Sequence, residues 1–284
     1  MSIVKPQVFA QFNRSHPLAV GLLGLWPMLE GSGDTVNDYC GQNNPGTLTN
    51  MVAEDDWVGS LYGTALDFGG TDKFVAGPTL TSPVTAWTAF GLYKPNSVSI
   101  GGIPWSIRDG SLGGCFLQPI FSNQTIVFRV HDDNSIQGNE IYVGRSTGNV
   151  LTTEWAAIHF VWDGTLSVGG VSIYYNGVRV DTTNVSRGTV NATSQLTCPL
   201  RLGVQFGTDG PGSGFAGQCA LFAWWGRVLR EDEIIDQVAD PFALLRPATP
   251  EPWLYYTAPA TGGRVYRPTP FRLGPKLLPI GVLA

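Results

Sequence analysis

Apolar and polar positions alternate over short stretches of the chain, most clearly between residues 155 and 162. One side of this segment would carry Ile158, Phe160 and Trp162, and the other Trp155, His159 and Val161. A period of two is typical of a β-strand that packs on at least one face. The segment is therefore predicted to be a strand in a packed sheet.

A hairpin is predicted directly after this strand. Residues 171–175 and 178–180 are two apolar runs separated by Asn176 and Gly177. Asn-Gly between such runs is a strong hairpin signal, because a type I′ turn needs positive φ at both central residues. Further strands are predicted at residues 125–130, 200–204 and 219–225. Repeated short strands between glycine-rich turns favour an all-β fold of two antiparallel sheets, a jelly-roll sandwich.

One short helix interrupts the strands after residue 230. Its first turn is acidic, Glu231-Asp232-Glu233, which the helix dipole favours. An apolar stripe would follow, formed by Ile234, Ile235 and Val238. Pro241 is expected to end the helix, because the residue before a proline resists the α conformation.

The two ends of the chain differ from this body. Residues 1–15 are predicted to be an N-terminal arm, residues 16–247 one jelly-roll domain, and residues 248–284 a proline-rich basic C-terminal arm. Six prolines among residues 252–284 disfavour a regular helix or central strand there.

The C-terminal arm is too rich in aromatic and aliphatic residues for a solvated linker. It should lie extended either on its own domain or on a neighbouring subunit, and we expect the second. The residues expected to bind the partner are Trp253, Tyr255, Tyr256, Arg264, Tyr266, Arg267, Phe271, Arg272 and Lys276.

The net charge of the chain bears on the kind of partner it can bind. The 284 residues carry a net charge of −5, and charged residues make up 14% of the chain, against about 25% in an average domain. A nucleic-acid partner is not expected, because binding DNA or RNA needs a basic surface. Residues 252–284 nevertheless contain four basic residues and no acidic one.

Targeting signals are not apparent in the sequence. No apolar stretch of about 18 residues is present, so no membrane partner is expected. The first ten residues lack the apolar core of a signal peptide, so synthesis in the cytoplasm of a host is expected. The four cysteines are then predicted to be free thiols, since the cytoplasm keeps thiols reduced.

Several segments resemble, in order along the chain, the laminin-G-like, concanavalin A-like jelly-roll family. They are residues 21–34, 36–38, 46–50, 65–70, 87–95, 155–164, 174–178 and 215–234. The resemblance covers roughly residues 16–247 and implies two sheets packed face to face. It places near the core Trp26, Phe68, Phe90, Phe160, Trp162 and one of Trp224 or Trp225.

The segments at the two ends of the body resemble a subset of this family found in bacteriophage and environmental sequences. They are His16-Pro17-Leu18-Ala19 and the proline-rich stretch after residues 240–247. This resemblance implies a virion structural protein, either a capsid decoration or cement protein or a tail-associated one. Its partners would be other copies of itself, in an oligomer, and other virion proteins.

Catalytic residues are not evident. The superfamily includes glycoside hydrolases, and the retaining ones need two carboxylates about 5 Å apart. Their E-x-D-x-E strand pattern is absent, and His16, His131 and His159 are scattered without a zinc or triad pattern. We therefore expect a non-enzymatic protein without a cofactor, in which His159 has a structural role.

Two binding sites remain open from the sequence. The resemblance implies a structural Ca²⁺, for which Asp34, Asn37 and Asp38 can supply oxygens. Ala220-Leu221, however, stands where the family often has an acidic pair. The alternative function is a carbohydrate-binding module for glycans on a host surface, with contacts expected from Trp57, Tyr62, Trp105 and Asp109.

Overall fold

The computed structural model describes most of the predicted body. The described residues are 5, 10–70, 72–82, 86–99, 102–107, 116–131, 140–143, 149–165, 168–181, 185–187, 196–207 and 210–245. The chain separates into two units, residues 1–249 and 250–284, and every described residue belongs to the first. The predicted C-terminal arm lies outside the described residues. No described helix is long and apolar enough to cross a membrane.

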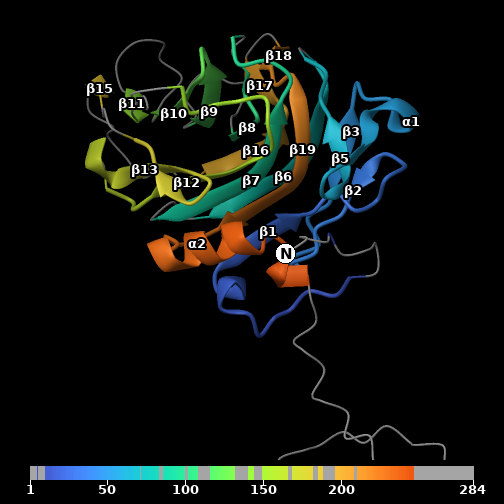
Figure 1. Cartoon of the computed structure of the whole chain (residues 1–284), viewed down its shortest axis with the longest axis horizontal. Coiled ribbons are helices and arrows are strands. Elements are labelled where there is room, and N and C mark those ends of the chain that lie inside the picture. Colours follow the sequence, from blue (N-terminus) through green and yellow to red (C-terminus); the bar gives the residue numbers. More distant parts are fainter. Residues whose placement is uncertain are drawn as a thin grey trace, which may run out of the picture. The chain divides into compact units, whose positions relative to one another are not determined.

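The described strands form two large antiparallel sheets and one small pair (Figure 1). Sheet A has, in spatial order, β14 (Val178–Arg179), β13 (Val171–Tyr175), β12 (Ala156–Trp162), β7 (Trp87–Pro95), β19 (Gly217–Trp225), β5 (Gly63–Asp67) and β4 (Trp57–Ser60), and β1 (Leu22–Trp26) also pairs with β19. Sheet B has β15 (Val185–Arg187), β11 (Glu140–Val143), β10 (Thr125–His131), β9 (Phe116–Ser122), β8 (Trp105–Ile107), β16 (Leu196–Leu202), β6 (Phe74–Ser82), β3 (Gly46–Thr49) and β2 (Thr35–Val36). The small pair is β17 (Val204–Gly207) with β18 (Gly210–Gly214).

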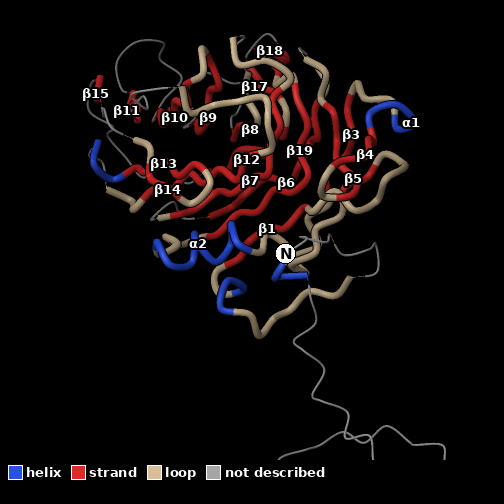
Figure 2. The backbone as a smooth tube through the Cα atoms, viewed as in Figure 1, coloured by secondary structure: helices blue, strands red, loops and turns tan. Residues whose placement is uncertain are grey.

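Helical segments are few in the described part of the chain and lie mostly at its margins (Figure 2). The α-helices are α1 (Ala53–Asp56) and α2 (Glu231–Ala239), and the 3-10 helices are η1 (Pro17–Ala19), η2 (Val168–Gly170) and η3 (Ala243–Leu245). This architecture is the all-β sandwich that the sequence predicts.

The main core lies between the two sheets. It contains inward side chains of sheet A, such as Trp87 and Phe160, and of sheet B, such as Trp105 and Phe128. Trp87 stacks on Trp224 with ring centroids 4.8 Å apart. Alternate side chains of facing sheets fill such a space, so large aromatics here stabilise the packing of sheet on sheet.

A second buried cluster covers the outer face of sheet A. It joins outward side chains of the sheet, such as Phe90 and Trp225, to Leu18 of η1, Ile234 of α2 and Leu244 of η3. Figure 1 shows α2 on the side of sheet A that faces away from sheet B. Sheet A is therefore buried on both faces over much of its area.

The predicted core is correct with one adjustment. Trp26, Phe68, Phe160, Trp162 and Trp224 lie between the sheets, as the family pattern implies. Phe90 is buried as well, but in the second cluster. The reason is the strand period of two: Phe90 follows Ala89, which points inward, so Phe90 must point outward.

The predicted hairpin and the alternation of β12 are confirmed. Tyr175 pairs with Val178, and Asn176 and Gly177 have φ values of 49° and 82°, as a type I′ turn requires. On β12, Ile158 faces the main core while Val161 faces the second cluster. The observed strand 178–179 is one residue shorter than predicted.

Helix α2 starts at the predicted position and ends one residue before Asp240. The Glu233 carboxylate accepts a hydrogen bond from the Arg230 backbone N–H at 2.9 Å and pairs with the Arg227 guanidinium at 2.8 Å. These contacts lower the pKa of Glu233, the Arg227 bond being the largest cause. The acidic first turn thus caps the helix and ties it to the end of β19.

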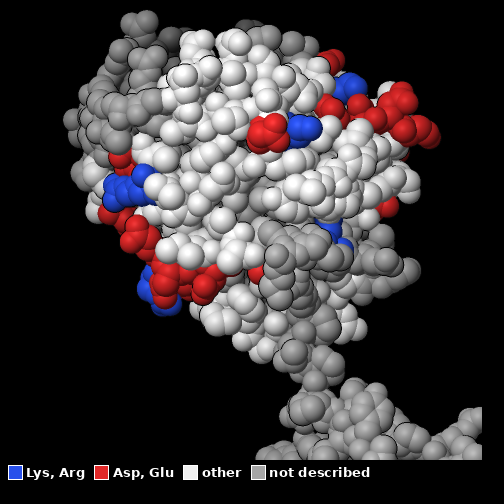
Figure 3. Space-filling model, in the orientation of Figure 1, with Lys and Arg blue, Asp and Glu red and all other residues white. Residues whose placement is uncertain are grey.

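Charged side chains are sparse on the face seen in Figure 3, and acidic ones gather over α2 and over α1. The acidic residues concerned are Glu231, Asp232 and Asp236 on α2, and Glu54 and Asp55 on α1.

The described residues of the predicted N-terminal arm pack on the domain. Ala10 and Phe12 contact the second cluster, and the Asn13 N–H donates to the Leu244 carbonyl at 2.7 Å. Lys5 is buried. Cys40 and Cys219 are buried free thiols, as the sequence predicts for them.

His159 makes the stability of the domain depend on pH. The imidazole is fully buried in sheet A and stacks on Phe90 with ring centroids 4.5 Å apart, and neither ring nitrogen has a hydrogen-bond partner among the described residues. Burial lowers its pKa to about 3, from 6.5. Between these values the unfolded chain binds more protons, so stability falls as the pH drops from 6.5 toward 3.

We predict that replacing the imidazole by an apolar side chain removes this loss. Between pH 7 and pH 4.5, the unfolding free energy of wild type should fall by about 2–3 kcal/mol more than that of His159→Leu. Urea unfolding of both proteins at the two pH values measures the difference. An equal acid response of the two proteins would contradict the buried neutral state of His159.

Candidate functional site

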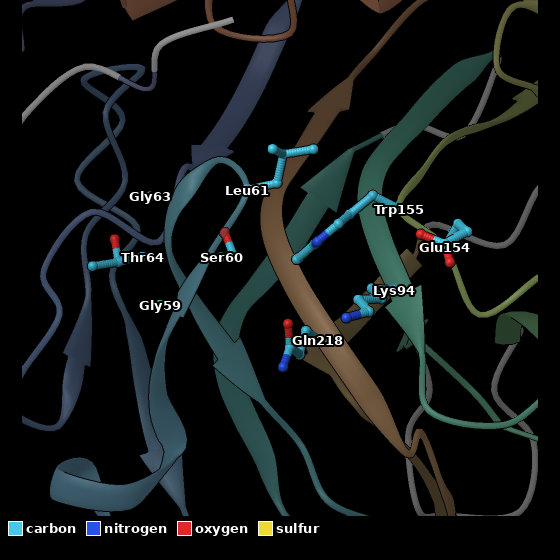
Figure 4. Close-up of a pocket in the computed structure, with 9 residues that line it drawn as sticks. All are labelled: Gly59, Ser60, Leu61, Gly63, Thr64, Lys94, Glu154, Trp155 and Gln218. Carbon is cyan, nitrogen blue, oxygen red and sulfur yellow. The ribbon is translucent and has the colours of Figure 1, made fainter.

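A groove of about 720 Å³ opens on the outer face of sheet A, beside the area that the second cluster covers. It lies over the β4–β5 hairpin, β7, β19 and the residues that lead into β12. The lining residues are Gly59, Ser60, Leu61, Gly63, Thr64, Lys94, Glu154, Trp155 and Gln218 (Figure 4).

Strand register brings the polar residues of the groove together. On sheet A, Lys94 of β7 pairs with Gln218 of β19, so both side chains leave the same face. Ala156 of β12 pairs with Tyr93, which places Trp155 next to Lys94 across the strands. Residues from distant parts of the chain therefore meet at one place.

Trp155 is the aromatic residue that lines the groove, and Tyr62 packs against it at the margin. Their rings meet edge to face with centroids 5.4 Å apart, and both side chains are half-buried. Figure 4 shows the Trp155 indole reaching toward β19, with Lys94 and Gln218 on one side of it. Leu61, in the turn of the β4–β5 hairpin, is 76% exposed.

The polar groups of the groove include both hydrogen-bond donors and acceptors. Gln218 Nε2 lies 3.5 Å from Asp67 Oδ2, which orients the amide. Figure 4 shows the ammonium end of Lys94 pointing toward Gln218, with Glu154 on the opposite side of Lys94. An aromatic surface beside an ammonium, an amide and a carboxylate can hold a ligand with one apolar face and several hydroxyl groups.

Two residues predicted to contact glycan are instead part of the main core, and those predictions are wrong. Trp105 is fully buried and packs against Phe128 and Trp224. Trp57 is 8% exposed, and its indole N–H donates to the Gly33 carbonyl at 2.9 Å. Both side chains lie on inward positions of their strands, which a sequence without burial information does not reveal.

The other residues predicted to bind a glycan or a partner lie partly at the groove and partly outside the described residues. Tyr62 lies at the margin of the groove, against Trp155. Asp109 and the partner-binding residues of the C-terminal arm lie outside the described residues. Lys94, Trp155 and Gln218 were not predicted as site residues, since their grouping depends on the pairing of strands far apart in sequence.

The residues predicted for calcium do not fit a calcium site. Both carboxylate oxygens of Asp38 accept hydrogen bonds from nearby backbone amides and a thiol. The Asn37 side-chain amide donates to Glu30, and Asp34 is exposed. Among the described residues, no three His, Cys, Asp or Glu side chains gather as a metal site. Asp38 instead fixes the loop that follows β1.

The groove does not contain the carboxylate pair of a retaining glycosidase. Of the residues that line it in the described structure, Glu154 alone carries a carboxylate. Cleavage of a glycosidic bond by the retaining mechanism requires a second carboxylate about 5 Å away.

Comparison with known protein families agrees with the observed fold and indicates a lectin-like β-sandwich. A family model, Laminin_G_3, described as the concanavalin A-like lectin/glucanases superfamily, matches residues 68–235. The chain belongs to this family. A comparison with curated proteins gives no significant match.

Solved structures with the same fold include toxin and enzyme domains that are distant in sequence. The binding domain of Paraclostridial Mosquitocidal Protein 1 is 13% identical, with a TM-score of 0.55 over 80% of this chain and 53% of that one. The botulinum neurotoxin serotype D binding domain is 9% identical, with a TM-score of 0.57 over 78% and 52%. The chain thus spans about half the length of these two domains.

A third structure is closer in size to this domain. Domain 4 of AbnA, a GH43 extracellular arabinanase from Geobacillus stearothermophilus, was solved in complex with arabinotriose. It is 16% identical, with a TM-score of 0.54 over 76% of this chain and 98% of that one. At such low identity these likenesses show the fold.

We predict that Trp105 acts on stability and not as an exposed ligand contact. Trp105→Ala should lower the free energy of unfolding by about 3–5 kcal/mol, the usual range for removing a buried large aromatic. Chemical denaturation measures the change. A loss below about 1 kcal/mol would contradict the core position of the indole.

Proposed function

We propose that the protein is a non-enzymatic carbohydrate-binding module and that the groove on sheet A binds the glycan. The observation that carries the proposal is the edge-to-face pair of Tyr62 and Trp155 beside Lys94, Gln218 and Glu154. The indole offers a flat apolar surface for the C–H face of a sugar ring. The ammonium, amide and carboxylate offer donors and acceptors for its hydroxyl groups.

The fold comparisons support the proposal by analogy. Two of the similar structures are named as binding domains of toxins, and the third is a domain of an arabinanase solved in complex with arabinotriose. A shared fold raises the expectation of binding but does not assign a ligand, since function resides in the site. The groove chemistry is therefore the main support.

Trp155 is predicted to be the principal contact. Full-length protein should bind one or more glycans on a broad array, and Trp155→Ala should weaken that binding by about tenfold or more. Truncation of a central interface aromatic commonly costs over 1 kcal/mol, and 1.4 kcal/mol corresponds to tenfold in affinity. Isothermal titration with the best glycan from the array measures the affinity.

A matched control separates this effect from a general surface effect. Ile235→Ala, on the exposed side of α2 and 54% exposed, should keep the wild-type affinity. Absence of binding to every glycan on the array would reject the proposed function. Equal affinity of Trp155→Ala and wild type would reject the groove as the binding site.

Assembly in a virion is a second proposed role, and its support is in the sequence. Residues 252–284 carry four basic residues, no acidic ones and many aromatics, while all 22 acidic residues precede them. Charge complementarity favours docking of the C-terminal arm on an acidic neighbouring subunit. The described residues do not include this arm, so a decoration or tail-associated role in a phage particle stays a prediction.

Removing the C-terminal arm tests this second role. A chain ending at residue 251 is predicted to keep the folded domain and to lose self-association. Sedimentation velocity of both chains at the same concentration measures the mass. An unchanged oligomeric state, or a full-length chain that is monomeric, would count against assembly through the arm.

A further inference from the structure

Lys5 is a buried charged residue that contacts three separate parts of the domain. Its side chain is 8% exposed. The ammonium donates to the carbonyls of Met28 and Ala220 at 3.0 Å each, and also to the carbonyl of Thr64. These carbonyls belong to the loop after β1, to β19 and to β5.

Such a set of acceptors forms a site for a primary ammonium. A lysine ammonium has three N–H donors, and here each has a carbonyl acceptor. Burying a charged group is costly unless its hydrogen bonds are replaced in this way. The ammonium also lies 5.7 Å from the centre of the Phe242 ring, a favourable cation–π distance.

Lys5 contacts the β4–β5 hairpin, which lines the groove. Thr64, whose carbonyl it binds, lines the groove, and so does Gly63. The Lys5 stem packs against Gly63 so closely that a Cβ at that glycine would lie 3.3 Å from Lys5 Cδ. Gly63 also has a φ of +94°, which disfavours any side chain.

A series of aromatic contacts also connects Lys5 to the groove. The Phe242 ring below its ammonium lies 6.1 Å from the ring of Tyr62. Tyr62 in turn contacts Trp155 at 5.4 Å. The buried ammonium, Phe242, Tyr62 and Trp155 thus form one continuous series of contacts that ends in the groove.

We propose that Lys5 is a positioning residue for the groove: its ammonium, held by the carbonyls of Met28, Thr64 and Ala220, fixes the β4–β5 hairpin and the Phe242–Tyr62–Trp155 contacts. The effect on ligand affinity rests on the proposed glycan-binding function. The effect on the hairpin does not, because it follows from the contacts of Lys5 alone.

The surroundings of Lys5 give this anchor a pH dependence. Among the described residues, the titratable groups that act on the ammonium are Glu30 and Cys219, and burial raises the pKa of the Cys219 thiol to about 12. Burial lowers the pKa of Lys5 from 10.5 to about 7, while Glu30 and Cys219 oppose the shift. Between pH 7 and 10.5 the unfolded chain binds more protons, so the contribution of Lys5 to stability rises with pH.

The test is Lys5→Met in the full chain, which keeps a stem of similar length and removes the ammonium. Amide hydrogen exchange in residues 57–67 should become at least fivefold faster, and glycan affinity should fall at least fivefold. Arg230→Met is the matched control, because its side chain is 70% exposed and lies at the start of α2. It should leave both readouts unchanged.

The outcomes separate the two proposals. Faster exchange in the hairpin together with weaker binding supports both. Unchanged exchange overturns the positioning role of Lys5, whatever the ligand result. Faster exchange in a protein that binds no glycan supports the anchor and rejects the proposed function. Faster exchange with wild-type affinity overturns the link between the anchor and the groove.

A pH profile tests whether the Lys5 amino group is desolvated, as its buried position requires. The urea midpoint of wild type relative to Lys5→Met should increase from pH 7 to pH 9.5, because the folded domain releases the Lys5 proton at lower pH than the unfolded chain does. A constant difference over this range would contradict the desolvated position of the amino group, on which the proposed contacts of Lys5 depend.

Discussion

The structure depends on one constraint, which is that sheet A must be covered on both of its faces. Every residue of β12 is buried, and so is every residue of β7 except Lys94. Sheet B covers the inner face, and segments from both ends of the domain, including α2, cover the outer face. Because a strand buried on both faces offers no polar side to water, the cover is as necessary to the fold as the sandwich itself.

The groove exists where this outer cover stops. Toward the middle of sheet A the outward residues are apolar, such as Phe90 and Leu92, and they are buried in the second cluster. Two residues further along β7 the outward residue is Lys94, which lines the groove. The change from apolar to polar along one face marks the edge of the cover, and Tyr62 and Trp155 lie at that edge. Lys5 connects this edge to the covering segments and to the hairpin that faces Trp155.

The fold of this protein has stronger support than its function. The all-β sandwich follows from strand pairing and from the family match over residues 68–235. Distant structures with the same fold include the binding domains of two toxins and a domain of an arabinanase. A sandwich of this type is a scaffold on which sites can be placed at several positions, so the residues of the groove carry the argument for glycan binding and the C-terminal arm carries the argument for assembly.

The sequence alone determined the local elements. The Asn176-Gly177 turn, the alternation of β12 and the acidic start of α2 were all readable, because turn chemistry, strand period and helix capping act over a few residues. The tertiary structure alone decided which aromatics are exposed. Trp57 and Trp105 look as available as Trp155 in the sequence, yet the first two lie in the core and the third lies in the groove. The physical reason is that the grouping of Lys94, Trp155 and Gln218, and the burial of Lys5, depend on registers between strands distant in sequence, which no local pattern encodes.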